Sequence, residues 1–483
     1  MSNPFKNLAG QTAVYGLGTV VPRLLNYLLV PLYTRVFAAD VYGQSTELYA
    51  YVALLLALLT YGMETTFFRF GKGDQFGKTY GNIMTAILAT TALFVLALSV
   101  AHPFVARGLG YGDKQAYILL LGLAVAADAV CAVPFCVLRQ HNKASRFSLI
   151  KMVNVGVNVA LNVLFLVVMP QASQRVANAV FGLAAGQLTW VFVSNLAASL
   201  VTLAMLWPQL RQVRPQWDGA LMRRLVSYAL PIMLINLIGM VNEVADKLFI
   251  KWMLPPETAL AQLGIYGANY KLAVLMTIFV QMFRFASEPF FFGKADDRNS
   301  PQLFADVMTY FVICGLFIFL LITLFLPLFA QFIGPEFREG LGIVPVVLAA
   351  NLMYGIVFNL GIWYKLSDHT QYGTVITAVG AVVTVVCLVT LVPRIGYWGA
   401  ACAHLGCYMV MMVVSYVWGQ RVYPIPYRVR RVGLYVALAA ALFALGYFLP
   451  MRHMALRYAL SSFYLALFLA VAYKCDLRRA LKE

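Results

Sequence analysis

The stretch YALPIMLINLIGMVNEVADKLFIKWML, residues 228–254, is long and apolar enough to cross a bilayer as one helix, yet it carries charged side chains. About 20 consecutive apolar residues span the hydrocarbon core of a membrane. Glu243 lies three residues before Asp246 and four before Lys247, so all three share one helix face. A charge at bilayer depth costs roughly 2.5–3.5 kcal/mol, and such residues usually face a wet cavity or a partner.

The composition of the whole chain is that of a polytopic membrane protein. Of its 483 residues, 62% are hydrophobic and 11% are charged, whereas soluble domains carry roughly 25% charged residues. The net charge of +17 would suit a nucleic-acid partner. However, the basic residues concentrate in every second loop, as they do in the cytoplasmic loops of membrane proteins. We therefore expect membrane lipids as surroundings and no nucleic acid.

Apolar runs predict an all-α protein with about fourteen transmembrane helices. The alternation of loop charge fits an even number of spans with both termini in the cytoplasm. The expected spans are 9–34, 42–68, 80–105, 115–138, 146–169, 178–207, 226–254, 262–292, 303–333, 340–365, 371–392, 397–420, 431–449 and 455–474.

The chain also repeats itself. PRLLN at 22–26 resembles PIMLIN at 231–236, and VYG at 41–43 resembles IYG at 265–267. We therefore expect two six-helix lobes related by a pseudo-two-fold axis along the membrane normal, an arrangement known in transporters with the site between the halves. The predicted domains are an N-terminal lobe at 1–210, a C-terminal lobe at 211–423 and a helix pair at 424–483.

Four cations lie deep within the expected spans, at least seven residues from either end, and suggest an anionic cargo: Arg23, Lys247, Lys271 and Arg284. Arg23 is the strongest candidate for a phosphate, because its planar guanidinium can bind two oxygens at once. Three of these cations could instead have a purely structural role. Arg23 could pair with a carboxylate such as Glu64 or Asp128, Lys247 could pair with Glu243, and Arg284 could snorkel to the headgroups.

Carboxylates also lie within the expected spans, and a buried carboxylate can exchange protons near neutral pH. Glu47 could instead sit close to the outer interface, and Glu64 could bridge to Arg69. The candidates for ion or proton coupling are Glu64, Asp128, Glu243, Asp246 and Glu288.

Asparagines recur every fourth residue along one face of the fifth span. Asn154 and Asn158 are candidates to contact sugar hydroxyls, and Asn162 continues the row. The alternative is hydrogen bonding between helices.

Signatures of catalysis and of cofactors are missing from the sequence. There is no GxxxxGK[ST] phosphate-binding loop, and the loops on the outer side are short. The seven cysteines lie mostly in apolar segments without zinc-like spacing. We therefore expect no enzyme activity, no catalytic residues, no metal and no cofactor.

The chain resembles bacterial polysaccharide flippases, the Wzx-like branch of the multidrug/oligosaccharidyl-lipid/polysaccharide (MOP) exporter superfamily. The resemblance rests on the fourteen-span duplication, Arg23 in the first helix, YGMETTFFRF at 61–70 and LGIYGANYKLAVLM at 263–276. FRF at 283–285 followed by SEPFFF suggests a lipopolysaccharide or capsule-type subgroup.

The resemblance implies a function. Such a protein would move undecaprenyl-diphosphate-linked oligosaccharide from the cytoplasmic to the periplasmic leaflet of the inner membrane by alternating access, coupled to H⁺ or Na⁺ or to the membrane potential. The product would serve O-antigen or capsule synthesis. A lipid II flippase is one alternative, and a cation-coupled multidrug exporter of the same fold is another.

Overall fold

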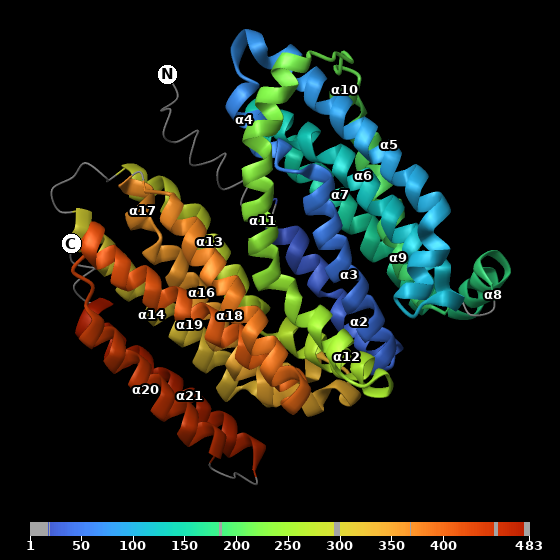
Figure 1. Ribbon diagram of the computed structural model, residues 1–483. Coiled ribbons are helices and arrows are strands. Elements are labelled where there is room, and N and C mark those ends of the chain that lie inside the picture. Colours follow the sequence, from blue (N-terminus) through green and yellow to red (C-terminus); the bar gives the residue numbers. More distant parts are fainter. Residues whose placement is uncertain are drawn as a thin grey trace. The chain divides into compact units, whose positions relative to one another are not determined.

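The computed structural model describes residues 18, 20–182, 186–293, 300–367, 369–448 and 453–477. Within these ranges the chain is helical and contains no strand, which confirms the all-α expectation (Figure 1). The chain forms two compact units. Unit 1 comprises 1–37 and 47–240, and unit 2 comprises 38–46 and 241–483. This division falls inside one helix, α11, and the domain boundaries expected at 210 and 423 stay predictions.

Unit 1 is built on four helices that pack side by side, α5, α6, α7 and α9 (Figure 1). Helical residues 20–27 precede its first labelled helix. Its elements are α2 (Leu29–Val36), α3 (Ala39–Thr60), α4 (Met63–Phe70), η1 (Gly73–Gln75), α5 (Phe76–Gly108), η2 (Gly112–Lys114), α6 (Gln115–Gln140), α7 (Ala144–Val163), η3 (Leu164–Val168), α8 (Pro170–Phe181), α9 (Leu188–Met205), α10 (Trp207–Leu210) and the first part of α11 (Gly219–Met253).

Unit 2 is built on α16, which packs against α19 and α14, and on α18, which packs along α19. Its elements after α11 are α12 (Pro256–Leu272), α13 (Val274–Gly293), α14 (Ser300–Leu324), α15 (Leu326–Phe329), η4 (Ala330–Phe332), η5 (Pro335–Ile343), α16 (Val344–Leu360), α17 (Ile362–Leu366), α18 (Gln371–Ile395), α19 (Tyr397–Val422), α20 (Val429–Phe448), α21 (Met454–Ala472) and η6 (Tyr473–Leu477).

Helices long and apolar enough to cross a membrane number twelve in the described ranges, or up to thirteen when a bent pair is counted as one span. Residues 9–17 and 19 of the first expected span, 9–34, lie outside these ranges, so the count of fourteen stays a prediction. The sixth expected span, 178–207, begins too early. Gly182 takes a φ of +95° and ends α8, and the apolar helix α9 begins only at Leu188.

A break between α3 and α4 positions Glu64 in the first turn of α4. Tyr61 and Gly62 both have positive φ, 30° and 75°, and a side chain at Gly62 would meet the carbonyl oxygen of Ala229 at 2.7 Å. Only glycine fits this turn without strain, because L-residues seldom adopt positive φ. The helix therefore ends at Thr60 and restarts at Met63.

Unit 2 contains a bend between two helices and a close crossing of two others. α12 and α13 meet at a bend of 51°, directly after Lys271 and Leu272, so backbone carbonyls near Lys271 leave the regular helix ladder. The start of α3 crosses α12 at Gly43 and Gly264, where an added Cβ would overlap the carbonyls of the facing helix. Small residues allow such close backbone approach in membranes, which explains why 38–46 belongs to unit 2.

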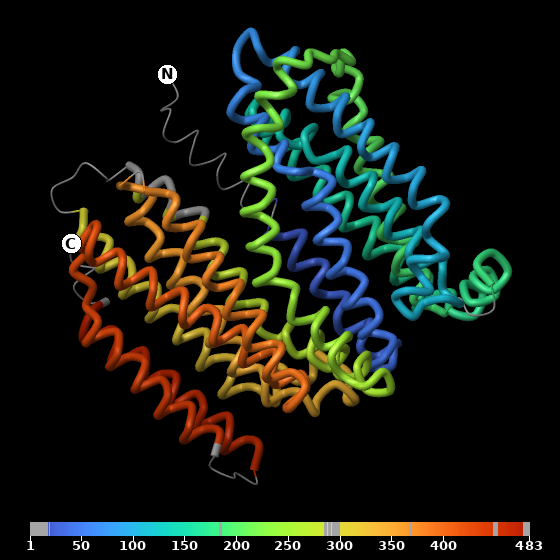
Figure 2. The backbone as a smooth tube through the Cα atoms, viewed as in Figure 1, coloured from blue at the N-terminus to red at the C-terminus, as the bar shows by residue number. Residues whose placement is uncertain are grey.

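The C-terminal helix pair, drawn in red in Figure 2, packs along α14. At one end Arg431 Nη1 lies 2.7 Å from Asp476 Oδ1, and Tyr435 donates to Asp476 Oδ2 at 2.6 Å. Arg428 Nη2 contacts Asp306 of α14 at 2.7 Å. These contacts hold the start of α20 against α14 and against η6.

Candidate functional site

Asp246 lies at the centre of a buried polar cluster in unit 2. Its residue is 2% exposed, and Tyr266 of α12 donates a hydrogen bond to Oδ2 at 2.6 Å. Lys247 Nζ lies 3.1 Å from Oδ1. Lys247 also donates to the backbone carbonyl of Glu243 at 3.0 Å. The ion pair of Lys247 is thus with its neighbour Asp246, and not with the Glu243 carboxylate considered from the sequence.

Histidine 404 completes this cluster, and its sequence context gives no indication of that role. His404 of α19 is 2% exposed and places Nδ1 3.6 Å from Asp246 Oδ2. Its ring packs against Tyr270 and Tyr408, at centroid distances of 5.8 and 5.1 Å. A single histidine in an apolar helix gives no signal in sequence, since its partner comes from a helix more than 150 residues earlier.

Exposed charges surround the buried cluster of unit 2. Glu243 and Lys271 are exposed, and the charge of Lys271 interacts with those of both Glu243 and Lys247. Arg284 is also exposed and lies over the ring of Phe358, 4.8 Å from its centroid. The structure therefore brings Lys247 and Lys271 together. The side chain of Glu288 lies outside the described residues.

A second charged cluster occupies unit 1, and Lys151 is at its centre. The charge of Lys151 interacts with those of Asp128, Glu64 and Arg23, and its Nζ lies 4.2 Å from the centroid of the Phe135 ring. The expected span 146–169 contains Lys151, although the loop-charge pattern also counts it on the inner side. In the structure α7 begins at Ala144, and Lys151 lies two turns inside it. Arg23 is exposed and close to this like charge.

A known protein family matches the first part of this chain. The family model described as "Polysaccharide biosynthesis protein" matches residues 8–292, more than half of the chain. The chain belongs to this polysaccharide biosynthesis family. Comparison with curated protein sequences gives no significant match.

Solved structures show which fold this chain has. The lipid II flippase MurJ in an inward closed conformation superposes with a TM-score of 0.70 at 10% identity, over 96% of this chain and 99% of that one. An outward-facing multidrug transporter of the MATE family, in the MOP superfamily, has a TM-score of 0.61 at 14% identity and coverages of 90% and 97%.

A further match is a MATE transporter from Vibrio cholerae, with a TM-score of 0.60 at 14% identity, over 86% of this chain and 96% of that chain. Identities this low establish the fold alone. The chain is thus a polytopic membrane protein by its apolar helices, and it has the fold of MurJ and of the MATE transporters.

The asparagine row of this family member forms hydrogen bonds between helices. Asn154 donates to Thr202 of α9 at 2.9 Å, and Asn158 donates to Asn26 at 3.3 Å. The third member, Asn162, accepts from Tyr33 at 2.9 Å. These bonds are the alternative that the sequence left open, and they hold α7 against α9 and the first helix.

Glu47 has a similar structural role in unit 1. It is 0% exposed, and Tyr111 donates to its Oε2 at 2.5 Å. Tyr111 lies in the connection between α5 and η2, where burial first and the Glu47 carboxylate second raise its pKa well above the ordinary value. Tyr111 therefore stays a hydrogen-bond donor at every pH at which the protein works.

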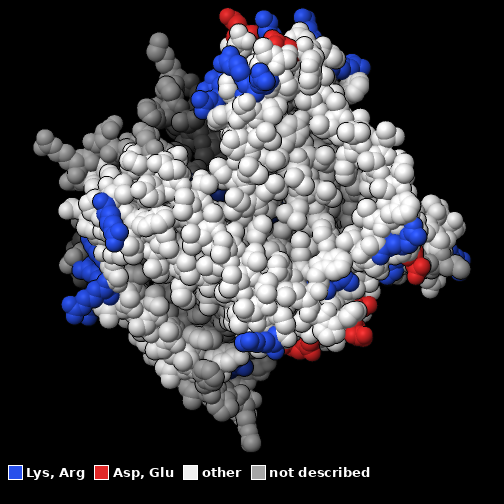
Figure 3. Space-filling view, in the orientation of Figure 1, with Lys and Arg blue, Asp and Glu red and all other residues white. Residues whose placement is uncertain are grey.

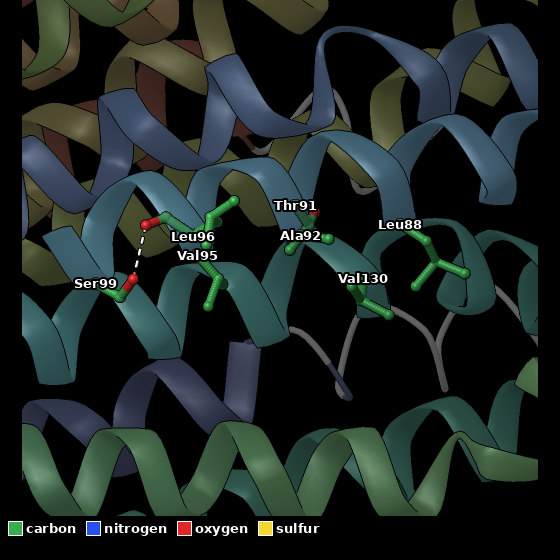
Figure 4. A pocket seen from close by; sticks show the side chains of 7 residues that line it. All are labelled: Leu88, Thr91, Ala92, Val95, Leu96, Ser99 and Val130. Carbon is green, nitrogen blue, oxygen red and sulfur yellow. Dashed lines mark hydrogen bonds between the residues drawn. The ribbon is translucent and has the colours of Figure 1, made fainter.

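The outer flank of unit 1 offers no charged site. Charged side chains of unit 1 gather towards the ends of its helices and leave the flank between them almost bare (Figure 3). A shallow groove of about 490 Å³ on α5 and α6 is lined by Leu88, Thr91, Ala92, Val95, Leu96, Ser99 and Val130 (Figure 4). The hydroxyl of Ser99 is bonded to the carbonyl of Leu96. Such a groove suits lipid chains, and not an anion.

Proposed function

We propose that this protein is a flippase that moves a polyprenyl-diphosphate-linked oligosaccharide from the cytoplasmic to the periplasmic leaflet by alternating access. The proposed location is the bacterial inner membrane, with both termini in the cytoplasm. The observation that carries the proposal is the surplus of cations on helices that are otherwise apolar. Deep within the spans expected at 226–254 and 262–292, the described cations Lys247, Lys271 and Arg284 outnumber the described carboxylates Glu243 and Asp246.

The physical reason lies in the cost of desolvation. A diphosphate that leaves water needs compensating cations, because an unpaired charge in a dry site costs several kcal/mol. Lys271 is exposed beside the bend between α12 and α13, and Lys247 is close enough to share its anion. In unit 1, Arg23 and Lys151 provide cations in the same way, beside Glu64 and Asp128.

The rival substrates differ in the charge they require. A cationic drug needs an acidic site, and the buried carboxylate of unit 2, Asp246, is already neutralised by Lys247. Lipid II also carries a diphosphate, so the charges favour neither glycan, and the family match is the support for a surface polysaccharide. O-antigen or capsule are the proposed products. H⁺ or Na⁺ is the proposed coupling ion.

Mass spectrometry of lipid extracts before and after depletion of the protein tests this function. We expect a polyprenyl-diphosphate oligosaccharide to accumulate and surface glycan to disappear, with both restored by the wild-type gene and not by Lys271→Gln. Cell lysis with accumulation of lipid II would instead indicate a flippase for the peptidoglycan precursor and not for a surface glycan. Altered drug sensitivity without any accumulated lipid would overturn the proposal.

A further inference from the structure

His404 is a titratable side chain in unit 2 that the proposed transport has not yet used. Its Nδ1 faces Asp246 Oδ2 at 3.6 Å. An ionised carboxylate only accepts hydrogen bonds, so Nδ1 carries the proton in the neutral ring. The other nitrogen, Nε2, is buried and has no hydrogen-bond partner among the described residues. Nε2 is therefore the atom that can take up a second proton.

Asp246 is shared between His404 and Lys247. The Lys247 ammonium occupies Oδ1 at 3.1 Å, whereas Oδ2 faces Tyr266 and His404. The Lys247 side chain is 18% exposed and its stem is long and rotatable, so its ammonium can turn towards the surface. Asp246 itself cannot follow. A buried carboxylate that loses its cation is strongly destabilised unless another one replaces it.

We propose that His404 takes up a proton when Lys247 leaves Asp246 to bind an anionic phosphate. This inference rests on the proposed function. The proton comes from solvent and forms the Nε2–H bond, and no other covalent bond changes. The imidazolium then compensates Asp246 in place of the ammonium. Anion binding and protonation of His404 are thus two sides of one exchange, and His404 is a positioning residue for Lys247.

The groups that face His404 fit this exchange. Lys247 and Lys271 oppose a positive charge on the ring, whereas Asp246 and Glu243 favour it. Departure of the nearest cation, Lys247, therefore shifts the balance towards the imidazolium. The remaining titratable neighbours are hydroxyls and thiols, which are neutral near pH 7. From the packed elements these are Tyr266 and Tyr270 on α12, Tyr354 on α16, Cys387 on α18, and Cys407 and Tyr408 on α19.

The exchange predicts a specific dependence on pH. Because the anion-bound protein holds one more proton, its affinity for the anion falls as pH rises. A single linked proton gives at most about a tenfold loss of affinity per pH unit.

Isothermal titration of the full-length protein in detergent micelles with farnesyl diphosphate tests the inference. The wild type and His404→Gln are titrated from about pH 5 to pH 8.5, which brackets the ordinary histidine range. The diphosphate's own titration is common to both proteins, so it cancels in the ratio of their affinities. We expect that ratio to change by up to about tenfold per pH unit. Equal pH profiles for the two proteins would overturn the inference.

A second measurement does not depend on the folding of a buried variant. Proton uptake on binding is measured for the wild type and for Lys247→Gln, in buffers of different ionisation enthalpy. We expect the wild type to take up more protons per bound diphosphate than Lys247→Gln. Equal uptake would again overturn the inference, while leaving the proposed function intact. A wild type that binds no diphosphate at all would overturn both.

Discussion

Replacing Asp246 by alanine tests the polar cluster of unit 2 most severely. The carboxylate holds Tyr266 at 2.6 Å and Lys247 at 3.1 Å, and it faces His404 at 3.6 Å. Breaking a buried ion pair costs roughly 3–5 kcal/mol in water-soluble proteins, because the remaining charge is left uncompensated.

Two effects lower this cost. The Lys247 side chain is 18% exposed and can turn to water, and a chain unfolded within a membrane still finds partners for its polar groups. We therefore expect Asp246→Ala to reduce the free energy of unfolding by about 3 kcal/mol. Tyr266→Phe removes one hydrogen bond and no charge, so we expect a loss of about 1 kcal/mol.

Unfolding by sodium dodecyl sulfate in mixed micelles measures these losses. The double variant supplies the sharper comparison, because the phenol of Tyr266 has already lost its acceptor in Asp246→Ala. We expect the double variant to be about as stable as Asp246→Ala alone. Costs that simply add, or an alanine variant no less stable than Tyr266→Phe, would refute the cluster as described.

Other consequences concern transport, helix packing and the C-terminal pair. Arg23→Ala and Lys247→Ala should each abolish transport while protein levels in the membrane stay normal; full transport in both would contradict a cationic site. Gly43→Leu should greatly lower the yield of folded protein, because its side chain would overlap a facing backbone carbonyl, whereas Gly77→Leu meets open space and should behave as wild type in size-exclusion chromatography. Arg431→Ala should weaken the packing of α20 by about 1–3 kcal/mol. A protease should then cleave the C-terminal helices faster than in the wild type. An unchanged cleavage rate would show that the Arg431–Asp476 contact does not stabilise this packing.

The spans were predictable because length and apolarity alone decide whether a segment enters a membrane. The residues at which the spans begin and end were harder to predict. The connection between α8 and α9 was missed because the left-handed conformation of Gly182 depends on local backbone, whereas the sequence around it reads as continuously apolar.

The interaction partners of polar residues were harder to predict than the helix faces on which those residues lie. Helical spacing was enough to put Glu243, Asp246 and Lys247 on one polar face, but it suggested Glu243 as the partner of the lysine, whereas the structure pairs Lys247 with Asp246. The roles of His404 and Asn154 depended entirely on residues distant in sequence. Such pairings require the packed helices, because no local periodicity relates α11 to α19 or α7 to α9.

The most direct test of the account uses purified protein in vesicles that contain a polyprenyl-diphosphate-linked oligosaccharide in both leaflets. A membrane-impermeant glycosidase, added outside, reports how much glycan remains protected in the inner leaflet. The account predicts that wild-type protein removes this protection and that Lys247→Ala does not. If the glycan stays as protected with folded wild-type protein as it is in protein-free vesicles, the result would contradict the central claim that this protein translocates lipid-linked glycan.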